Sequence, residues 1–183
     1  MAKDFVRTIL ESGTKKEKIR CIEGLENTSN PTKIQMIIER LDDKDIQVRG
    51  EAFSSLVSNE NDIAEQLVKN LNSEKTYVRG FLALILANRK NSHGNSEIIK
   101  MTKDKNAMVR SCALGALGHL KAGEAVNAVQ SCFSDADLEV RKSAIKAAID
   151  LDCALNPAEF KNFSNDEELK RLLVLAKQTH SVE

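Results

Sequence analysis

Residues 43–56 read DKDIQVRGEAFSSL, and a similar stretch, DADLEVRKSA, occupies residues 135–144. Their shared Val-Arg pair, followed three positions after the arginine by a small or apolar residue, occurs four times. The arginines of these pairs are Arg49, Arg79, Arg110 and Arg141, separated by 30, 31 and 31 residues. Self-similarity at a fixed period is the signature of a repeat architecture. The chain is therefore predicted to be an array of short, similar units.

The same register extends towards both ends of the chain. The position eight residues before each arginine is apolar in every unit but one, and is filled by Leu10, Leu41, Leu71, Thr102, Phe133 and Phe163. Lys18 and Arg171 take the arginine position near the two ends. The period predicts one domain, residues 1–183, of about six repeats. Their approximate bounds are 1–29, 30–59, 60–91, 92–122, 123–155 and 156–183.

Each repeat is expected to contain two α-helices. Ile34, Ile37, Ile38 and Leu41 recur at the spacing of one helical face, and Asn30 followed by Pro31 suits a helix start. The expected helix pairs are 3–12 and 15–28, 31–42 and 45–58, 60–72 and 75–90, 95–104 and 106–121, 123–134 and 137–153, and 157–163 and 166–180. One pair cannot bury its own apolar stripes, so neighbouring pairs must stack. The predicted fold class is all-α, a right-handed α-solenoid.

The pattern D-x-D-x-x-V-R-x-x-A, complete in residues 43–52 and 135–144, resembles the short HEAT-like repeat first named after phycobilisome lyases. The resemblance covers residues 31–153 well and the flanking units poorly. It implies that the second helices line a concave face and that an Arg–Asp ladder ties neighbouring repeats together. The third unit departs from the pattern, with Ser73 and Lys75 where other units carry aspartate. Loss of an aspartate cap predicts a weaker start for its second helix.

Bulk composition narrows the function classes. The chain has 27 basic and 27 acidic residues and a formal net charge of +0, which argues against a general nucleic-acid binder. Its four cysteines form no C-x-x-C pair, and the start, MAKDFVRTIL, lacks the features of a signal peptide. Reduced thiols and a cytoplasmic location are therefore expected. The longest apolar run, residues 81–87, is far shorter than the ~20 residues of a membrane span.

The arginine ladder, Arg49, Arg79, Arg110 and Arg141, has two interpretations. The arginines either form a row of cations aimed at phosphates or at a carboxylate-rich partner, or they pair with aspartates at the turns between helices. An example of the second interpretation is Arg79 with Asp43 or Asp45. The family resemblance favours this structural role, for which a planar bidentate donor is the right group.

Groups that might carry catalysis are sparse. His93, His119 and His180 are not clustered as metal ligands, and none precedes an acid, so the His-Glu pairs of HEAT-repeat di-iron hydroxylases are absent. HEAT-like DNA glycosylases need a basic face and aromatic residues, whereas this chain has no tryptophan and one tyrosine, Tyr77. No catalytic, cofactor-binding or metal-binding residue is predicted, and the chain is not expected to be an enzyme.

The cysteines have structural interpretations. Cys21 aligns with the buried column of small residues, Cys132 adjoins Phe133, and Cys112 is expected near the exposed side of a helix. A nucleophilic thiolate needs a histidine partner or an equivalent, and the sequence predicts none.

The positions one and five residues after each arginine are expected to point outward on the concave face. They are filled by Gly50 and Ser54, Gly80 and Leu84, Ser111 and Gly115, and Lys142 and Lys146. One interpretation is a shallow groove for a partner helix or peptide, with a basic end for acidic residues. The other is that the small residues simply ease helix packing. The sequence leaves both open.

These observations favour a non-enzymatic scaffold that binds a protein partner through the concave face. One alternative is a lyase- or chaperone-like factor that acts on a chromophore- or cofactor-bearing protein, by analogy with the phycobilin lyases. A nucleic-acid-binding role is the other, and it would require Lys142, Lys146 and further cations to converge on one face despite zero net charge.

Overall fold

The computed structural model describes residues 2–153, 167, 168, 170–172 and 174. All regular structure within these residues is helical, so the all-α prediction is confirmed. The chain divides into two compact units, Met1–Gly94 and Asn95–Glu183, which are described separately. The predicted sixth repeat lies almost entirely outside the described residues.

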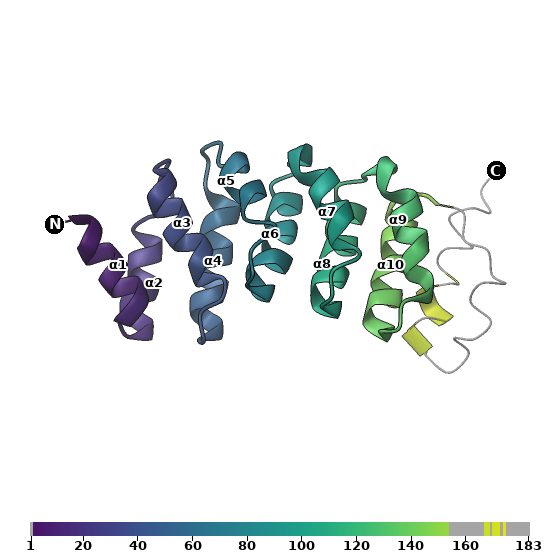
Figure 1. The fold of residues 1–183 in the computed structure, drawn as a ribbon, viewed down its shortest axis with the longest axis horizontal. Helices are drawn as coiled ribbons and strands as arrows, with labels where there is room; N and C mark the ends of the chain where they lie inside the picture. Colours follow the sequence, from purple (N-terminus) through teal and green to yellow (C-terminus); the bar gives the residue numbers. More distant parts are fainter. Residues whose placement is uncertain (1, 154–166, 169, 173, 175–183) are drawn as a thin grey trace. The chain divides into compact units, whose positions relative to one another are not determined.

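The first unit is a stack of three helix pairs (Figure 1). The pairs are α1 (Ala2–Ser12) with α2 (Lys15–Glu23), α3 (Pro31–Arg40) with α4 (Ile46–Ser58), and α5 (Ala64–Lys69) with α6 (Thr76–Asn88), followed by a 3-10 turn, η1 (Ser92–Gly94). The first helices contact one another in the order α1, α3, α5, and the second helices in the order α2, α4, α6. Stacking therefore produces two layers in this unit, one of first helices and one of second helices.

The second unit contains two described helix pairs. They are α7 (Asn95–Met101) with α8 (Ala107–His119), and α9 (Val126–Ser131) with α10 (Leu138–Asp150), with 3-10 turns η2 (Gly123–Ala125) and η3 (Cys132–Ser134) beside α9. The second helices α8 and α10 pack closely. A Cβ atom added at Gly118 would lie 2.9 Å from the Cα of Ala147, so only glycine allows this approach.

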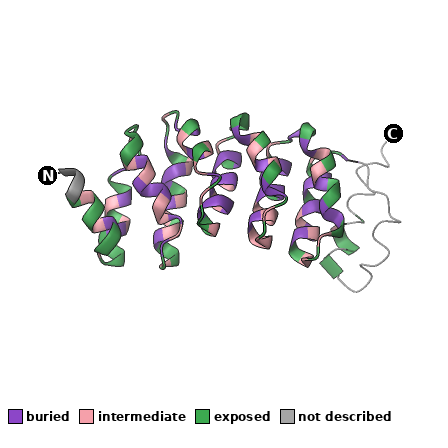
Figure 2. Cartoon of the chain, in the orientation of Figure 1, coloured by how far each residue is buried: buried purple, intermediate pink, exposed green. Residues whose placement is uncertain are grey.

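The repeat register determines the core. The valine of every Val-Arg pair and the residue three positions after every arginine are buried, as Figure 2 shows for the helices that carry them. These residues are Val48, Val78, Val109, Val140, Ala52, Leu82, Ala113 and Ala144. Thr102, which interrupts the apolar column, is also buried, and its hydroxyl donates a hydrogen bond of 2.8 Å to the carbonyl of Ile99. A local bond thus satisfies the one polar group in the column.

Side-chain caps begin most of the second helices. Asp45, Asn106 and Asp137 accept backbone N–H groups at the starts of α4, α8 and α10. Lys75, before α6, makes no side-chain cap hydrogen bond. The predicted loss of the cap at this helix is confirmed.

The first helices of the later pairs are shorter than the sequence indicated. The predicted helices 60–72 and 123–134 are α5 and α9, of six residues each. Neither begins with a side-chain cap, and 3-10 turns flank α9. Uncapped ends commonly tighten into 3-10 geometry, which shortens the α-helical part.

Three second helices end at a residue with left-handed backbone conformation. Lys90, Lys121 and Asp152, each eleven positions after an arginine, have φ angles of 52°, 50° and 53°. At Lys121 the backbone N–H bonds to the carbonyl of Gly118, and the N–H of Ala122 bonds to that of Leu117. This is the Schellman pattern, which normally places glycine at the left-handed position. A lysine there is strained because its Cβ approaches the following carbonyl.

Replacement of Lys121 by glycine is expected to raise the free energy of unfolding by about 1 kcal/mol, because glycine adopts the left-handed conformation without this strain. Urea denaturation followed by circular dichroism measures the change. Lys121→Ala is the matched control, since alanine also lacks the lysine side chain but keeps the strained Cβ. An equal gain in the alanine variant would contradict the explanation.

Candidate interaction surface

The four ladder arginines share one backbone contact. In each, Nη1 donates to the carbonyl six residues earlier, in the turn between the two helices of its own repeat. The bonds join Arg49 to Asp43 (2.8 Å), Arg79 to Ser73 (2.7 Å), Arg110 to Asp104 (2.8 Å) and Arg141 to Asp135 (2.6 Å). The repeated arginine therefore holds the turn of its own repeat, a role that the sequence analysis did not predict.

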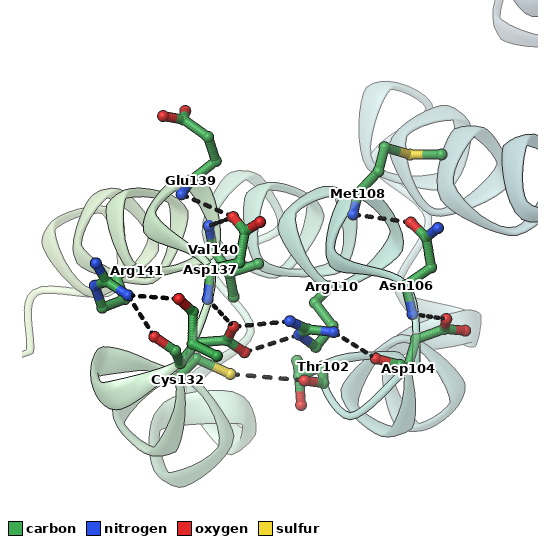
Figure 3. Close-up of polar contacts among 12 residues, drawn as sticks. Thr102, Asp104, Asn106, Met108, Arg110, Cys132, Asp137, Glu139, Val140 and Arg141 are labelled. Carbon is green, nitrogen blue, oxygen red and sulfur yellow. Dashed lines mark hydrogen bonds and ion pairs between the residues drawn. The ribbon is translucent and has the colours of Figure 1, made fainter.

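The ladder position also makes ion pairs between repeats. Nε and Nη2 of Arg110 lie 2.8 and 2.7 Å from the two carboxylate oxygens of Asp135 (Figure 3). In the first unit, Nζ of Lys18 lies 2.7 Å from Oδ2 of Asp43, and both side chains are less than a tenth exposed. We call such a pair, from the ladder position to an aspartate of the following repeat, a rung.

Rungs run towards the next repeat in the chain, 25 residues ahead in both cases. The example given from the sequence paired Arg79 with Asp43 or Asp45, both in the preceding repeat. In the structure Asp43 pairs with Lys18, and Asp45 caps the start of α4.

The rung carboxylates are held in the ionised form. The hydrogen bond from Arg110 lowers the pKa of Asp135, against the opposing effect of burial. Burial alone would raise the pKa of Asp43. The hydrogen bonds from Lys18 and from the Asp45 backbone, with the nearby positive charges, outweigh burial and lower it.

Arg49 lacks a rung because the equivalent position in the next repeat is Ser73. The hydroxyl of Ser73 still accepts the N–H of Lys75 at 3.3 Å, as the carboxylate of Asp43 accepts the N–H of Asp45. The described hydrogen bonds of Arg49 all come from Nη1, which contacts the turn carbonyls. Its guanidinium lies 4.9 Å from the ring centroid of Tyr77. The Nε and Nη2 edge that binds a carboxylate in Arg110 thus has no acceptor among the described residues.

Tyr77, which lies against this arginine, belongs to a cluster of three aromatic rings. Tyr77 stacks on Phe81 with centroids 5.7 Å apart, and Phe53 meets Phe81 edge-on at 6.1 Å. Tyr77 is 43% exposed, and both phenylalanines are half-buried. We call Arg49, Phe53, Tyr77 and Phe81 the α4–α6 patch. The sequence analysis missed it, although the spacing of Tyr77 and Phe81 by four residues places them on one helical face.

The predicted surface positions have mixed exposure. Gly50, Ser54, Gly115 and Lys146 are exposed, Leu84 and Ser111 are half-buried, and Gly80 and Lys142 are buried. The expectation that all of them point outward is wrong for Gly80 and Lys142. The first lies in α6, a helix buried over much of its circumference. Lys142 has its long side chain covered, with only 11% exposed.

The basic end expected at Lys142 and Lys146 is neutralised. Nζ of Lys142 lies 3.2 Å from a carboxylate oxygen of Glu139 and 3.0 Å from one of Glu168. Nζ of Lys146 lies 2.8 Å from the other oxygen of Glu168. The hydrogen bonds from Lys146 and Lys142 lower the pKa of Glu168. These two lysines are therefore compensated by acids, which weakens the nucleic-acid alternative that depended on them.

The four cysteines are free thiols whose pKa values move away from those of nucleophiles. Burial raises the pKa of each of them, and it raises that of Cys112 to about 11. A catalytic thiol requires the opposite shift. His93 and His119 are exposed, and His180 lies outside the described residues. No group of three or more His, Cys, Asp or Glu side chains that could hold a metal ion occurs in the described part of the chain.

Cys112 is expected to react slowly with iodoacetamide in the folded protein. With a pKa of about 11, only about one thiol in a thousand is ionised at pH 8, and the thiolate is the reactive form. Mass spectrometry of the peptide containing Cys112, after timed alkylation, measures the rate. It should rise steeply up to about pH 11, whereas the same peptide in urea should react quickly near pH 9. Fast alkylation of the folded protein at pH 8 would contradict the assignment.

Comparison with known families is consistent with this architecture. The family model for HEAT repeats matches residues 64–149, from α5 to near the end of α10. This protein contains HEAT repeats. The rung of Arg110 and the turn contacts of Arg110 and Arg141 lie within the matched segment, whereas Arg49 and its open edge precede it. No curated protein matches the sequence significantly.

Solved structures share the fold of these HEAT repeats at low sequence identity. An engineered protein is 17% identical with a TM-score of 0.54, and the match covers 98% of this chain and 96% of that one. The complex of CpcE and CpcF of phycocyanin lyase from a Nostoc species is 18% identical with a TM-score of 0.57, covering 94% and 74%. A structure from work on TOG–tubulin binding specificity is 16% identical with a TM-score of 0.55, covering 97% and 81%. The likeness supports the predicted α-solenoid, armadillo-like fold.

Among the residues that the structure describes, no helix combines the length and the apolar character that a membrane crossing requires.

Proposed function

We propose that this HEAT-repeat protein is a non-enzymatic scaffold that binds a protein partner through the exposed side of its second helices. HEAT repeats generally mediate protein binding, and stacked repeats offer extended surfaces for it. Each compact unit is proposed to bind through its own second helices.

The observation that carries the proposal is the combination of small exposed residues and aromatic rings along α4 and α6. Gly50 and Ser54 lie one turn apart and are exposed, and a Cβ atom added at Gly50 would meet nothing within 4 Å. A partner backbone can therefore approach α4 closely at this point. The rings of Tyr77 and Phe81 lie beside it, and aromatic residues are enriched at protein interfaces because they bury much area at small entropic cost. In the second unit, Gly115 offers a similar exposed position on α8.

The non-enzymatic part of the proposal is supported by the state of the side chains. The thiols have raised pKa values, as described above, and the exposed His93 and His119 are not part of any potential metal cluster in the described residues. The lyase- or chaperone-like alternative has only the fold likeness to CpcE and CpcF in its favour. It predicts a change in bilin absorbance on mixing with the protein, which the scaffold proposal does not.

Affinity capture from the native lysate, quantified by mass spectrometry, tests the proposal with two matched variants. Gly50→Arg places a long side chain on the surface of α4. Gly123→Arg is the control, because Gly123 is also exposed and also has open space around its Cβ position, but it lies outside the second helices. Gly80 is unsuitable because it is buried. We expect captured partners to be lost with Gly50→Arg and retained with Gly123→Arg. If all three proteins capture the same partners, the proposal is wrong.

A further inference from the structure

We infer that the α4–α6 patch binds a carboxylate of the partner, which completes from outside the rung that Ser73 leaves open. The expected partner segment carries an aspartate or glutamate next to an aromatic or branched aliphatic residue. This inference rests on the proposed function and names the chemical class of its partner.

Arg49 differs from the register-equivalent positions Arg110 and Lys18 in lacking a carboxylate partner. Arg110 has the same turn contact as Arg49, and in addition holds Asp135 through two short parallel hydrogen bonds. Lys18 likewise pairs with Asp43. Arg49 keeps the hydrogen bond to its own turn, but no carboxylate among the described residues pairs with its Nε and Nη2 edge. The ladder is thus built to bind carboxylates, and at this position the ligand is not supplied by the adjoining repeat.

Ser73 replaces only one of the two contacts that the equivalent aspartate makes. Asp43 accepts a backbone N–H with one oxygen and the Lys18 ammonium with the other. Ser73 keeps the first contact, to the N–H of Lys75, and has no second oxygen. The turn is therefore preserved while the carboxylate-binding edge of Arg49 is left open.

The surroundings of the Arg49 edge also suit a carboxylate beside an apolar group. The guanidinium lies over the ring of Tyr77, 4.9 Å from its centroid, in a cation–π contact that holds the side chain at this surface. Lys75 lies nearby in sequence, but its ammonium is 3.7 Å from the carboxylate of Asp42, so Arg49 is the cation that the patch offers. The rings of the patch and Ile46, which is 72% exposed, provide apolar surface for a neighbouring side chain. A partner segment with an acidic side chain beside an apolar one therefore matches the α4–α6 patch.

Peptide selection tests the inference directly. A phage-displayed library of random peptides is selected on the full-length protein, with Gly50→Arg used for counterselection, and enriched peptides are labelled for fluorescence anisotropy. We expect the enriched sequences to share an acidic residue beside an apolar one. Ser73→Asp, which supplies the missing carboxylate within the chain, should weaken their binding about tenfold or more, the value of one charge-assisted contact. The control Ser73→Asn keeps the turn acceptor without the charge, and should change the affinity by no more than about twofold.

Two further variants separate the possible outcomes. Arg49→Gln should weaken binding as much as Ser73→Asp does, and adding Ser73→Asp to it should have no further effect. Enriched peptides that contain no acid, or that bind Ser73→Asp as tightly as the unmodified protein, would overturn the inference. The proposed function would survive that result if the lysate partners were lost with Gly50→Arg and retained with Gly123→Arg. Failure to enrich any peptide would also overturn the inference, while the lysate capture decides separately on the proposed function.

Discussion

Lys18→Met is expected to lower the free energy of unfolding by about 3–5 kcal/mol, the usual cost of removing one partner from a buried ion pair. Lys18 and Asp43 are 2.7 Å apart, with side chains 8% and 5% exposed. Methionine fills a similar volume but leaves the carboxylate of Asp43 buried without its cation. Urea denaturation followed by far-UV circular dichroism measures the loss.

Lys16→Met is the matched control for this prediction, because Lys16 is exposed in the same helix. It should change stability by less than about 0.5 kcal/mol. If both substitutions lowered the free energy of unfolding equally, the rung between Lys18 and Asp43 would make no specific contribution to stability.

The difference between Lys18→Met and the unmodified protein should also depend on pH. The pKa of Asp43 is lowered in the folded protein. A carboxyl group of this kind stabilises the fold above its unfolded pKa, near 4, and loses that contribution as the pH falls through its folded value. Without Lys18, burial raises the pKa of Asp43, so its carboxylate is protonated first in the variant. The stability difference should therefore be full at neutral pH, shrink on acidification, and be lost once the pH falls through the lowered pKa of Asp43 in the unmodified protein.

In the second unit, Arg110→Met should lower the free energy of unfolding by about 3 kcal/mol, because the carboxylate of Asp135 loses its bidentate donor. The two side chains are 16% and 12% exposed, so solvent offers little replacement. The double variant Arg110→Met with Asp135→Asn should regain part of the loss, since it removes the uncompensated charge. Lys105→Met, at an exposed position before α8, is the control. A double variant less stable than Arg110→Met would contradict this account.

The sequence predicted the features that depend on periodicity. A spacing of 30 and 31 residues placed every valine of the Val-Arg pairs in the core, because register in a stacked array fixes which face of a helix is covered. The weak cap at Lys75 followed from the chemistry of the residue alone.

Features that depend on contacts between repeats were harder to predict. The direction of the rungs, from Lys18 to Asp43 and from Arg110 to Asp135, follows from how neighbouring pairs are offset, and the period does not give that offset. Lys142 was expected to be exposed, but Glu139 and Glu168 allow it to be buried. Glu168 is 26 residues away in the chain, so its role was invisible to a pattern within one repeat.

The α4–α6 patch shows why a departure from the repeat pattern can be more informative than the pattern itself. In the sequence, Ser73 stands where other repeats carry aspartate, and this predicts an effect at the start of α6. The structure shows that it also affects Arg49, in the preceding repeat, through the missing rung. A sequence analysis that pairs each ladder position with the aspartate position 24 or 25 residues later would have found it.

The most direct test of the open rung is a double-mutant cycle at Arg49 and Ser73, measured as the free energy of unfolding in urea. If the guanidinium edge of Arg49 is free to bind a carboxylate, Ser73→Asp should stabilise the protein, and the coupling energy with Arg49→Gln should be about 1.5 kcal/mol in favour of the pair. A coupling energy indistinguishable from zero would show that the edge cannot take a carboxylate, and would contradict the account of this surface.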